Sequence, residues 1–180
     1  MDPVSLSMQP AGSLRLGPLA AKAPDRCACC GHLAPAASVA GRALCMTCVP
    51  AFALDEPDID KVSALIWLPY LDQPVVSRLV TAVHTARAAD STASPRRDAL
   101  GFSKAAQAVL DMLLAQRAAA IARIGTDRPS VFRAAGLSLN GISIPKRTGV
   151  SALRFVALGG WFGPDTGLYQ SAAAEWICGQ

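Results

Sequence analysis

The sequence predicts an α+β fold in which a small cysteine-rich segment is followed by helices. Three observations support this prediction. Five of the six cysteines fall within residues 27–48, CACCGHLAPAASVAGRALCMTC. The run SALIWLP, residues 63–69, has the apolar composition of a buried strand and ends at a proline. From residue 72 onward, the apolar residues recur at helical spacing.

Length and composition limit the class of protein. The chain has 180 residues, which suffice for one domain with a sizeable core. Its composition is 52% hydrophobic, yet charged residues interrupt every stretch that approaches the roughly 18–20 apolar residues of a membrane span. The first residues, MDPVSLSMQPAGS, lack the basic start and apolar centre of a secretory signal. We therefore expect a cytoplasmic protein with no direct membrane insertion.

The charge pattern does not favour nucleic acid as a partner. The net charge is +4, but the basic residues are dispersed along the chain. Proteins that follow a phosphate backbone usually gather such residues on one element. Between residues 27 and 52 there is one arginine, Arg42, and one aromatic residue, Phe52. We expect the dispersed charges to form an ordinary solvated surface.

The N-terminal residues predict a pair of short strands. Residues 4–8, VSLSM, alternate apolar and small polar side chains, which is the period of a strand. Residues 13–17, SLRLG, predict its partner, with a turn at residues 9–12 between them.

The cysteine spacing predicts a metal site. Cys27 and Cys30 form one Cys-x-x-Cys pair, and Cys45 and Cys48 form a second one after 14 intervening residues. In a chain without a secretory signal, this pattern indicates Zn²⁺ binding rather than disulfides. Gly31 supplies the permissive backbone that a turn around a metal needs.

Four thiolates leave no open position on the metal, so we expect a structural zinc ion. A redox role would place a single Cys-x-x-Cys pair at the start of a helix, which two facing pairs fit less well. Cys29 or His32 can replace a neighbour in a Cys₃His site, and the sequence leaves this alternative open. We assign no role to Cys178.

The middle of the chain predicts a linker, a strand and two helices. Residues 51–60 form an acidic linker that Pro57 interrupts, and the strand SALIWLP follows it. A helix over residues 72–89 begins with Asp72 as N-cap and Pro74 in its first turn. His84 lies beside its apolar face as a packed or boundary histidine. That face consists of Val75, Val76, Leu79, Val80 and Val83.

A polar loop over residues 89–97 leads to the second helix, residues 102–124, which ends at Gly125. The apolar face of this helix contains Phe102, Ala106, Val109, Leu110, Leu113, Leu114 and Ile121.

The last third predicts a short helix, a strand and irregular chain. The helix, within TDRPSVFRAAG, begins at Asp127 or Arg128 and ends at Gly136. LRFVAL, residues 153–158, predicts a strand. The later aromatic residues are expected to anchor irregular chain to the core, and an exposed docking surface is the alternative. They are Trp161, Phe162, Tyr169 and Trp176. We divide the chain into residues 1–70, which hold the metal site, and residues 71–180, which pack on them as part of one domain.

Two cysteine pairs, an acidic segment and then ALIWLPYLDQPVVSRLV, residues 64–80, follow one another in this chain. This order resembles the IcmJ/DotN family of type IVB (Dot/Icm) secretion systems and related conjugation systems, with ALIWLPYLDQ as the most specific phrase. RIGTDRPSVF, residues 123–132, and LRFVAL fit the same family, so the resemblance spans about residues 4–160.

The resemblance implies a zinc-stabilised, HNH-like (treble-clef-like) core with C-terminal helices and no nuclease chemistry. It implies a subunit of the coupling complex at the cytoplasmic face of the inner membrane. Such a subunit binds the C-terminal tail of a DotL-like coupling ATPase beside adaptor subunits and helps to recruit substrates. Only Cys27, Cys30, Cys45 and Cys48 match residues of the family's site, as metal ligands.

The chain differs from the family in four respects. The segment before Cys27 is shorter, Cys29 is additional, the gap between the cysteine pairs is shorter, and Tyr70 stands where an acidic residue is usual.

No enzymatic function is expected. An HNH nuclease needs one histidine as general base and another to hold a catalytic metal, but His32 is the only histidine near the cysteines. The sequence contains no phosphate-binding loop and no nucleophile motif. A nucleic-acid-binding or degenerate HNH nuclease-like module remains the alternative to an interaction subunit.

Overall fold

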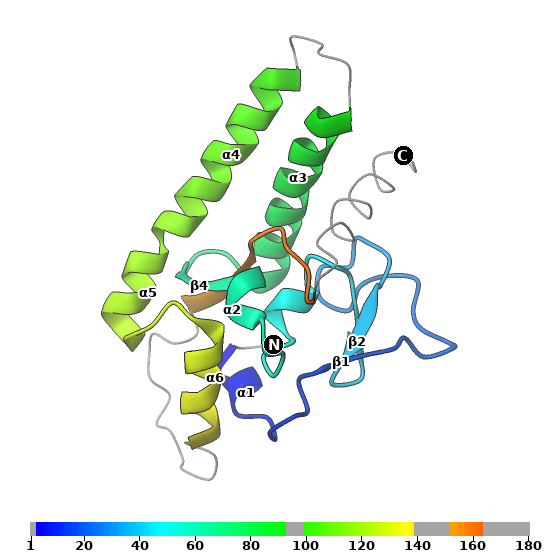
Figure 1. Cartoon of the computed structure of the whole chain (residues 1–180), viewed down its shortest axis with the longest axis vertical. Coiled ribbons are helices and arrows are strands. Elements are labelled where there is room, and N and C mark those ends of the chain that lie inside the picture. Colours follow the sequence, from blue (N-terminus) through cyan, green and yellow to red (C-terminus); the bar gives the residue numbers. More distant parts are fainter. Residues whose placement is uncertain (1–2, 93–98, 139–151, 164–180) are drawn as a thin grey trace.

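The computed structural model describes residues 3–92, 99–138 and 152–163 (Figure 1). The mixed α+β class predicted from the sequence is confirmed. The elements in chain order are α1 Pro3–Ser7, β1 Leu16–Gly17, β2 Ala37–Val39, β3 Arg42–Leu44, the 3₁₀ turn η1 Val49–Ala51, α2 Ile59–Val62, β4 Ser63–Trp67, α3 Gln73–Thr92, α4 Ala99–Ala115, α5 Arg117–Ile124, α6 Pro129–Ser138 and β5 Leu153–Ala157.

A two-stranded antiparallel sheet of β4 and β5 lies at the centre of the molecule. Both strands were predicted as such, and they pair with Leu65 opposite Phe155. Alternate side chains enter two different cores because the sheet is buried on both faces. Leu65 and Phe155 belong to a core shared with the cysteine-rich segment, α1, α5 and α6. Ile66 and Val156 belong to a second core, shared with α3 and α4.

Other parts of the chain cover both edges of this sheet. On the β4 edge, the amides of Leu65 and Trp67 donate to the carbonyls of Asp127 and Gln116, at 2.8 and 3.2 Å. On the β5 edge, the side-chain amide of Gln73 donates to the carbonyl of Phe155 at 2.9 Å and accepts from its N–H at 2.8 Å. The sheet therefore exposes little unpaired backbone to other chains.

Helix α3 confirms the helix predicted for residues 72–89 and continues to Thr92, into the predicted loop. Val76, Val80 and Val83 are buried against α4 as expected. Val75 was assigned to the same face, but it is 43% exposed. Its prediction was wrong because the helix turns Val75 away from the core that Val76 enters.

The single helix predicted for residues 102–124 is two helices, α4 and α5, separated at Gln116. The carbonyl of Gln116 accepts from the N–H of Trp67 as well as from that of Ala120. The break itself lies at the N–H of Gln116, which donates to the carbonyl of Leu113, three residues back, at 3.1 Å. Ile121, predicted on the buried face, is 47% exposed, because after the break at Gln116 it is Ala120, one position earlier, that enters the core. Gly125 ends α5 with φ +79°, as predicted.

The N-terminal strand prediction was wrong, because residues 3–7 form the helix α1, which packs against α6. Residues 16–17 do form a strand, but β1 pairs with β2. Gly136 lies inside α6, which continues to Ser138, so the predicted end of this helix was also wrong. A Cβ atom at residue 136 would lie 2.4 Å from the carbonyl oxygen of Ser7.

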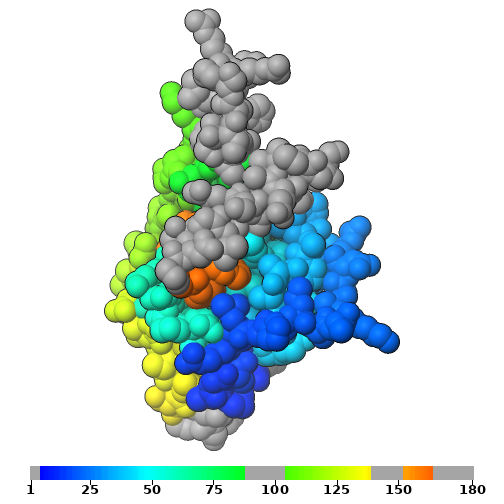
Figure 2. Space-filling model, turned by 45° about the vertical axis from the view of Figure 1, so that its right-hand side comes forward, coloured from blue at the N-terminus to red at the C-terminus, as the bar shows by residue number. Residues whose placement is uncertain are grey.

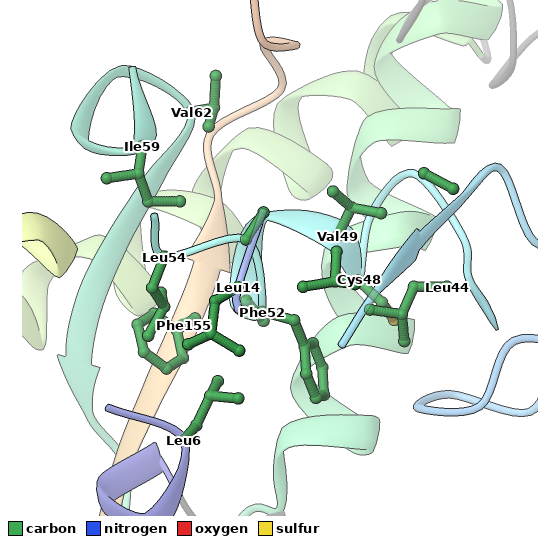
Figure 3. Packing of buried hydrophobic residues seen from close by; sticks show 14 of the residues in the cluster. Leu6, Leu14, Leu44, Cys48, Val49, Phe52, Leu54, Ile59, Val62 and Phe155 are labelled. Carbon is green, nitrogen blue, oxygen red and sulfur yellow. The ribbon is translucent and has the colours of Figure 1, made fainter. Parts of the chain in front are cut away.

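Residues 51–60 are part of the core and do not form the linker that was predicted. Phe52, Leu54 and Ile59 are buried in the core that faces the cysteine-rich segment (Figure 3). The carboxylates of Asp55 and Glu56 accept from the N–H groups of Leu14 and Leu16, each at 2.9 Å. These acidic residues therefore fasten the N-terminal segment to the core.

The cysteine-rich segment forms a lobe on one side of the molecule. Figure 2 shows this lobe, coloured blue to cyan, opposite α4 to α6, coloured green to yellow. Trp161 and Phe162 are half-buried against the first core and pack edge to face, with ring centroids 5.6 Å apart. Tyr169, Trp176 and Cys178 lie outside the described residues. Among the helices that are described, none has the length and apolar character to cross a bilayer.

Candidate metal centre

The fold brings together the four cysteines of the two Cys-x-x-Cys pairs. The Sγ atoms of Cys27, Cys30, Cys45 and Cys48 all lie within 4.8 Å of one another, and each residue is at most 5% exposed. Figure 3 shows Cys48 between Leu44 and Phe52, so that the apolar core forms one wall of the cluster.

The spacing of the sulfur atoms fits one tetrahedral metal ion. A Zn–S bond of about 2.3 Å in tetrahedral geometry places two sulfurs about 3.8 Å apart. The Sγ atoms of Cys30 and Cys45 are 3.7 Å apart. Four soft thiolate ligands in a buried site are the set that Zn²⁺ prefers. The cluster can therefore hold a metal ion without rearrangement of the backbone.

The first pair lies on a tight turn. The amide of Cys27 donates to the carbonyl of Leu33 at 2.8 Å, and the amide of Gly31 donates back to the carbonyl of Cys27 at 2.9 Å. Gly31 has φ +67°, which confirms the conformation expected from its position. The N–H of Cys29 points at the sulfur of Cys27, 3.4 Å away. Such N–H to sulfur bonds stabilise a thiolate.

A hairpin that the sequence analysis missed connects the two pairs. Strands β2 and β3 pair with Val39 opposite Arg42, which leaves Ala40 and Gly41 as a two-residue turn. Both turn residues have positive φ, +49° and +73°, which is typical of a type I′ turn. The usual signal is Asn-Gly or Asp-Gly, and alanine in the first position conceals it.

The second pair lies on the turn that leads into η1. The amides of Cys48 and Val49 both donate to the carbonyl of Cys45, at 3.0 and 2.9 Å. This turn places both sulfurs on the side that faces the first pair. Because Val49 is fully buried in the core, the position of the second pair is fixed by apolar packing.

The four thiols interact strongly with one another in the absence of a metal. Hydrogen bonds from Cys27, and then from Cys45 and Cys48, hold the pKa of the Cys30 thiol well below its usual range. Hydrogen bonds with Cys27, and then with Cys29 and Cys30, raise the pKa of the Cys48 thiol well above its usual range. A metal ion that binds here takes the place of the thiol protons.

Cys29 and His32, the two alternative ligands, lie outside the group of four. Cys29 is half-buried, and a hydrogen bond with the Cys48 thiol lowers the pKa of its own thiol against the effect of burial. His32 is exposed to solvent. The predicted packing of His84 is confirmed, since its Nε2 lies 2.9 Å from the carbonyl oxygen of Ala157.

Two threonines beside the cluster were missed by the sequence analysis. Thr47 Oγ1 lies 3.3 Å from the sulfur of Cys45 and 2.6 Å from Thr81 Oγ1 on α3. Thr47 lies between the cysteines of the second pair, which marks it as a neighbour of the site. Nothing in the sequence indicates that Thr81, 34 positions later, is its partner.

A scan against protein-family models and searches of curated proteins and of solved structures find no match to this chain. The similarity to the IcmJ/DotN family therefore stays a prediction from the sequence.

Proposed function

We propose that Cys27, Cys30, Cys45 and Cys48 hold one structural Zn²⁺ ion. The observation that supports this most is the meeting of four buried sulfur atoms within 4.8 Å. A zinc ion with four thiolate ligands supplies a cross-link and has no free position for a reacting water. The four cysteines would hold the ion, and the surrounding core would exclude solvent from it.

The arrangement of a turn with two cysteines, the β2–β3 hairpin and a second cysteine turn before η1 supports a treble-clef-like core, as in HNH folds. We propose this fold assignment together with a role that involves no catalysis. The zinc ion then fixes a lobe whose surface is available for binding other proteins.

We further propose that the chain is a subunit of a type IVB coupling complex, which holds it at the cytoplasmic face of the inner membrane. The phrase ALIWLPYLDQ supports this through its resemblance to the family; in the structure it forms β4 and the turn into α3. Tyr70 in that turn is 93% exposed, on a scaffold fixed by the buried strand before it. The partners are the C-terminal tail of a DotL-like coupling ATPase and adaptor subunits.

The test is co-purification of the zinc-loaded protein with the C-terminal tail of the coupling ATPase from the same organism. Size-exclusion chromatography with metal analysis of the peak measures both parts of the proposal. We expect a stable complex with one zinc ion per chain. Zinc-loaded protein that never binds the tail would refute the secretion role but not the metal centre.

A nucleic-acid-binding module is the second candidate. Arg15, Lys22, Arg26 and Arg42 lie on the metal-binding lobe, and within the described part of the chain none of them forms an ion pair. Binding to a generic DNA duplex near physiological salt, which falls steeply as salt is added, would favour this candidate. Loss of that binding in Arg15→Ala and Arg42→Ala variants would assign it to the lobe.

A further inference from the structure

A row of buried hydroxyl groups leads from the cysteine cluster to helix α3. Thr47 Oγ1 lies 3.3 Å from Cys45 Sγ, and Thr81 Oγ1 lies 2.6 Å from Thr47 Oγ1. Thr81 Oγ1 also lies 2.8 Å from the main-chain carbonyl oxygen of Ser77, a second acceptor for its single proton. The side chains of Thr47 and Thr81 are 8% and 5% exposed, so solvent does not compete for these bonds.

The row continues to the central sheet. Gln73 donates to the hydroxyl of Ser77 at 3.2 Å, and its amide also pairs with the backbone of Phe155 on β5. Gln73, Ser77 and Thr81 recur every four residues, so they form one buried polar stripe along α3. This stripe joins the cysteine cluster to a strand more than a hundred residues away in sequence.

The protons available decide the direction of these bonds. Each threonine hydroxyl has one proton, and the Ser77 carbonyl can only accept. A cysteine that binds a metal ion gives up its thiol proton to the solvent and becomes an acceptor. In the loaded centre the Thr47 proton goes to the sulfur of Cys45. The single proton of Thr81 then turns from the Ser77 carbonyl to Thr47, because otherwise no proton would lie between two hydroxyl oxygens 2.6 Å apart.

We propose that Thr47 is a positioning residue of the metal centre, which donates a hydrogen bond to the metal-bound sulfur of Cys45 and is itself held by Thr81. This inference rests on the proposed zinc site. Groups that hydrogen-bond to metal ligands typically change metal affinity by about 10–100-fold. Thr47 and Thr81 thus raise zinc affinity and tie the loaded centre to α3.

The test is zinc affinity, measured by competition with a chromophoric chelator. Thr47→Val keeps the shape of the side chain and removes the hydroxyl, and we expect zinc binding to weaken by about 10-fold or more. Thr47→Ser keeps the hydroxyl and should restore wild-type affinity. Thr85→Val is the matched control, since Thr85 is a buried threonine one turn further along α3, and among the described residues the side chains of Thr47 and Thr81 bond to each other, Cys45 and Ser77 but not to that of Thr85. Circular dichroism of each loaded variant checks its fold.

A double-mutant cycle tests the link to α3. Thr81→Val should weaken zinc binding less than Thr47→Val, because Thr47 can still donate to the sulfur. If Thr81 acts only through Thr47, the variant with both changes should bind zinc no more weakly than Thr47→Val alone. The effects of Thr47→Val and Thr85→Val should simply add. Additive losses for Thr47 and Thr81 would overturn the link between them.

The outcomes separate this inference from the proposals on which it rests. Wild-type protein that binds one zinc ion, together with a Thr47→Val variant of equal affinity, would overturn the inference and leave the zinc site intact. Wild-type protein that binds no zinc would overturn both. Should Thr47→Val give no folded protein, Thr81→Val decides, because unchanged zinc affinity in that variant overturns the role of the pair. Failure to bind the ATPase tail affects neither conclusion.

Discussion

Arg133 on α6 is the most highly bonded side chain that the structure describes. All five of its N–H groups are used: two donate to the carboxylate of Asp55, at 2.8 and 3.0 Å, and three donate to backbone carbonyls of residues 7–10. Its side chain is 3% exposed. Burial raises the pKa of Asp55, but the hydrogen bonds from Arg133 and from the backbone N–H groups of Leu14 and Gly12, together with the charge of Arg133, lower it below its usual value. The pair is therefore ionised and fully bonded.

Replacing this arginine should be costly. Arg133→Met keeps much of the apolar volume but removes five hydrogen bonds, so that the Asp55 carboxylate loses its cation and the carbonyls of Ser7, Gln9 and Pro10 each lose a donor. We expect a loss of about 3–5 kcal/mol in the free energy of unfolding, measured by urea titration of the zinc-loaded protein.

The matched control is Arg128→Met, at the residue directly before α6. Arg128 also pairs with an aspartate, Asp60, at 2.8 Å, but its side chain is 63% exposed. An exposed pair contributes less than about 1 kcal/mol. Equal losses in the two variants would show that burial of Arg133 does not decide its contribution.

At the scale of elements, the contact between α1 and α6 depends on the absence of a side chain at Gly136. A Cβ atom there would lie 2.4 Å from the main-chain carbonyl oxygen of Ser7 and 2.5 Å from its hydroxyl oxygen. In an unconstrained helix, alanine is more favourable than glycine by about 1 kcal/mol. The clash should reverse this preference.

Gly136→Ala should therefore destabilise the protein, with a lower urea midpoint than wild type. Ser138→Ala is the control, because Ser138 is exposed on the same helix and the change should alter stability by less than about 0.5 kcal/mol. A Gly136→Ala variant with a raised midpoint would mean that α1 leaves α6 in solution.

Sequence patterns correctly predicted the elements that depend only on residues close together in the chain. The apolar run of β4, the start of α3 and the end of α5 at Gly125 are each specified within a few residues. Residues 4–8 alternate like a strand but form α1, because packing on α6 overrides the pattern. At the break, the carbonyl of Gln116 accepts from the N–H of Trp67, a contact that no local pattern records.

At the scale of the molecule, the two cores should depend differently on the metal ion proposed for the cysteine cluster. The cysteine-rich lobe shares its core with β5, η1 and α1, whereas α3 and α4 share a second core with the other face of the sheet. Removal of a metal ion should therefore open the lobe first and leave the α3–α4 pair packed.

We expect chelation of zinc to lower the melting temperature by about 10 °C or more, because metal binding of this kind contributes several kcal/mol to folding. Limited proteolysis should then cut first within residues 20–50. Cys45→Ser and Cys48→Ser should give insoluble or protease-sensitive protein. Cys29→Ser is the matched control and should keep the zinc content and the melting temperature of wild type. A chelated protein that melts like the loaded one would contradict a structural metal.

The spacing of the cysteines predicted the candidate ligands, because a Cys-x-x-Cys pair forms its own turn. The supporting groups could not be predicted in this way. Thr81 and Gln73 reach the lobe and β5 only through the packing of α3, and their polar stripe looks in the sequence like an exposed helix face.

The pairing of β4 with β5 also sets the order in which a growing chain can fold. Leu65 on β4 and its partner Phe155 on β5 are 90 positions apart, a stretch that a ribosome takes roughly 5–18 s to make. During that interval residues 27–48 have already emerged, while the apolar strand SALIW lacks its neighbour. A chain that stops before Leu153 leaves this strand open to other nascent chains. If the lobe bound its metal ion early and folded, it would cover one face of β4 until β5 is made.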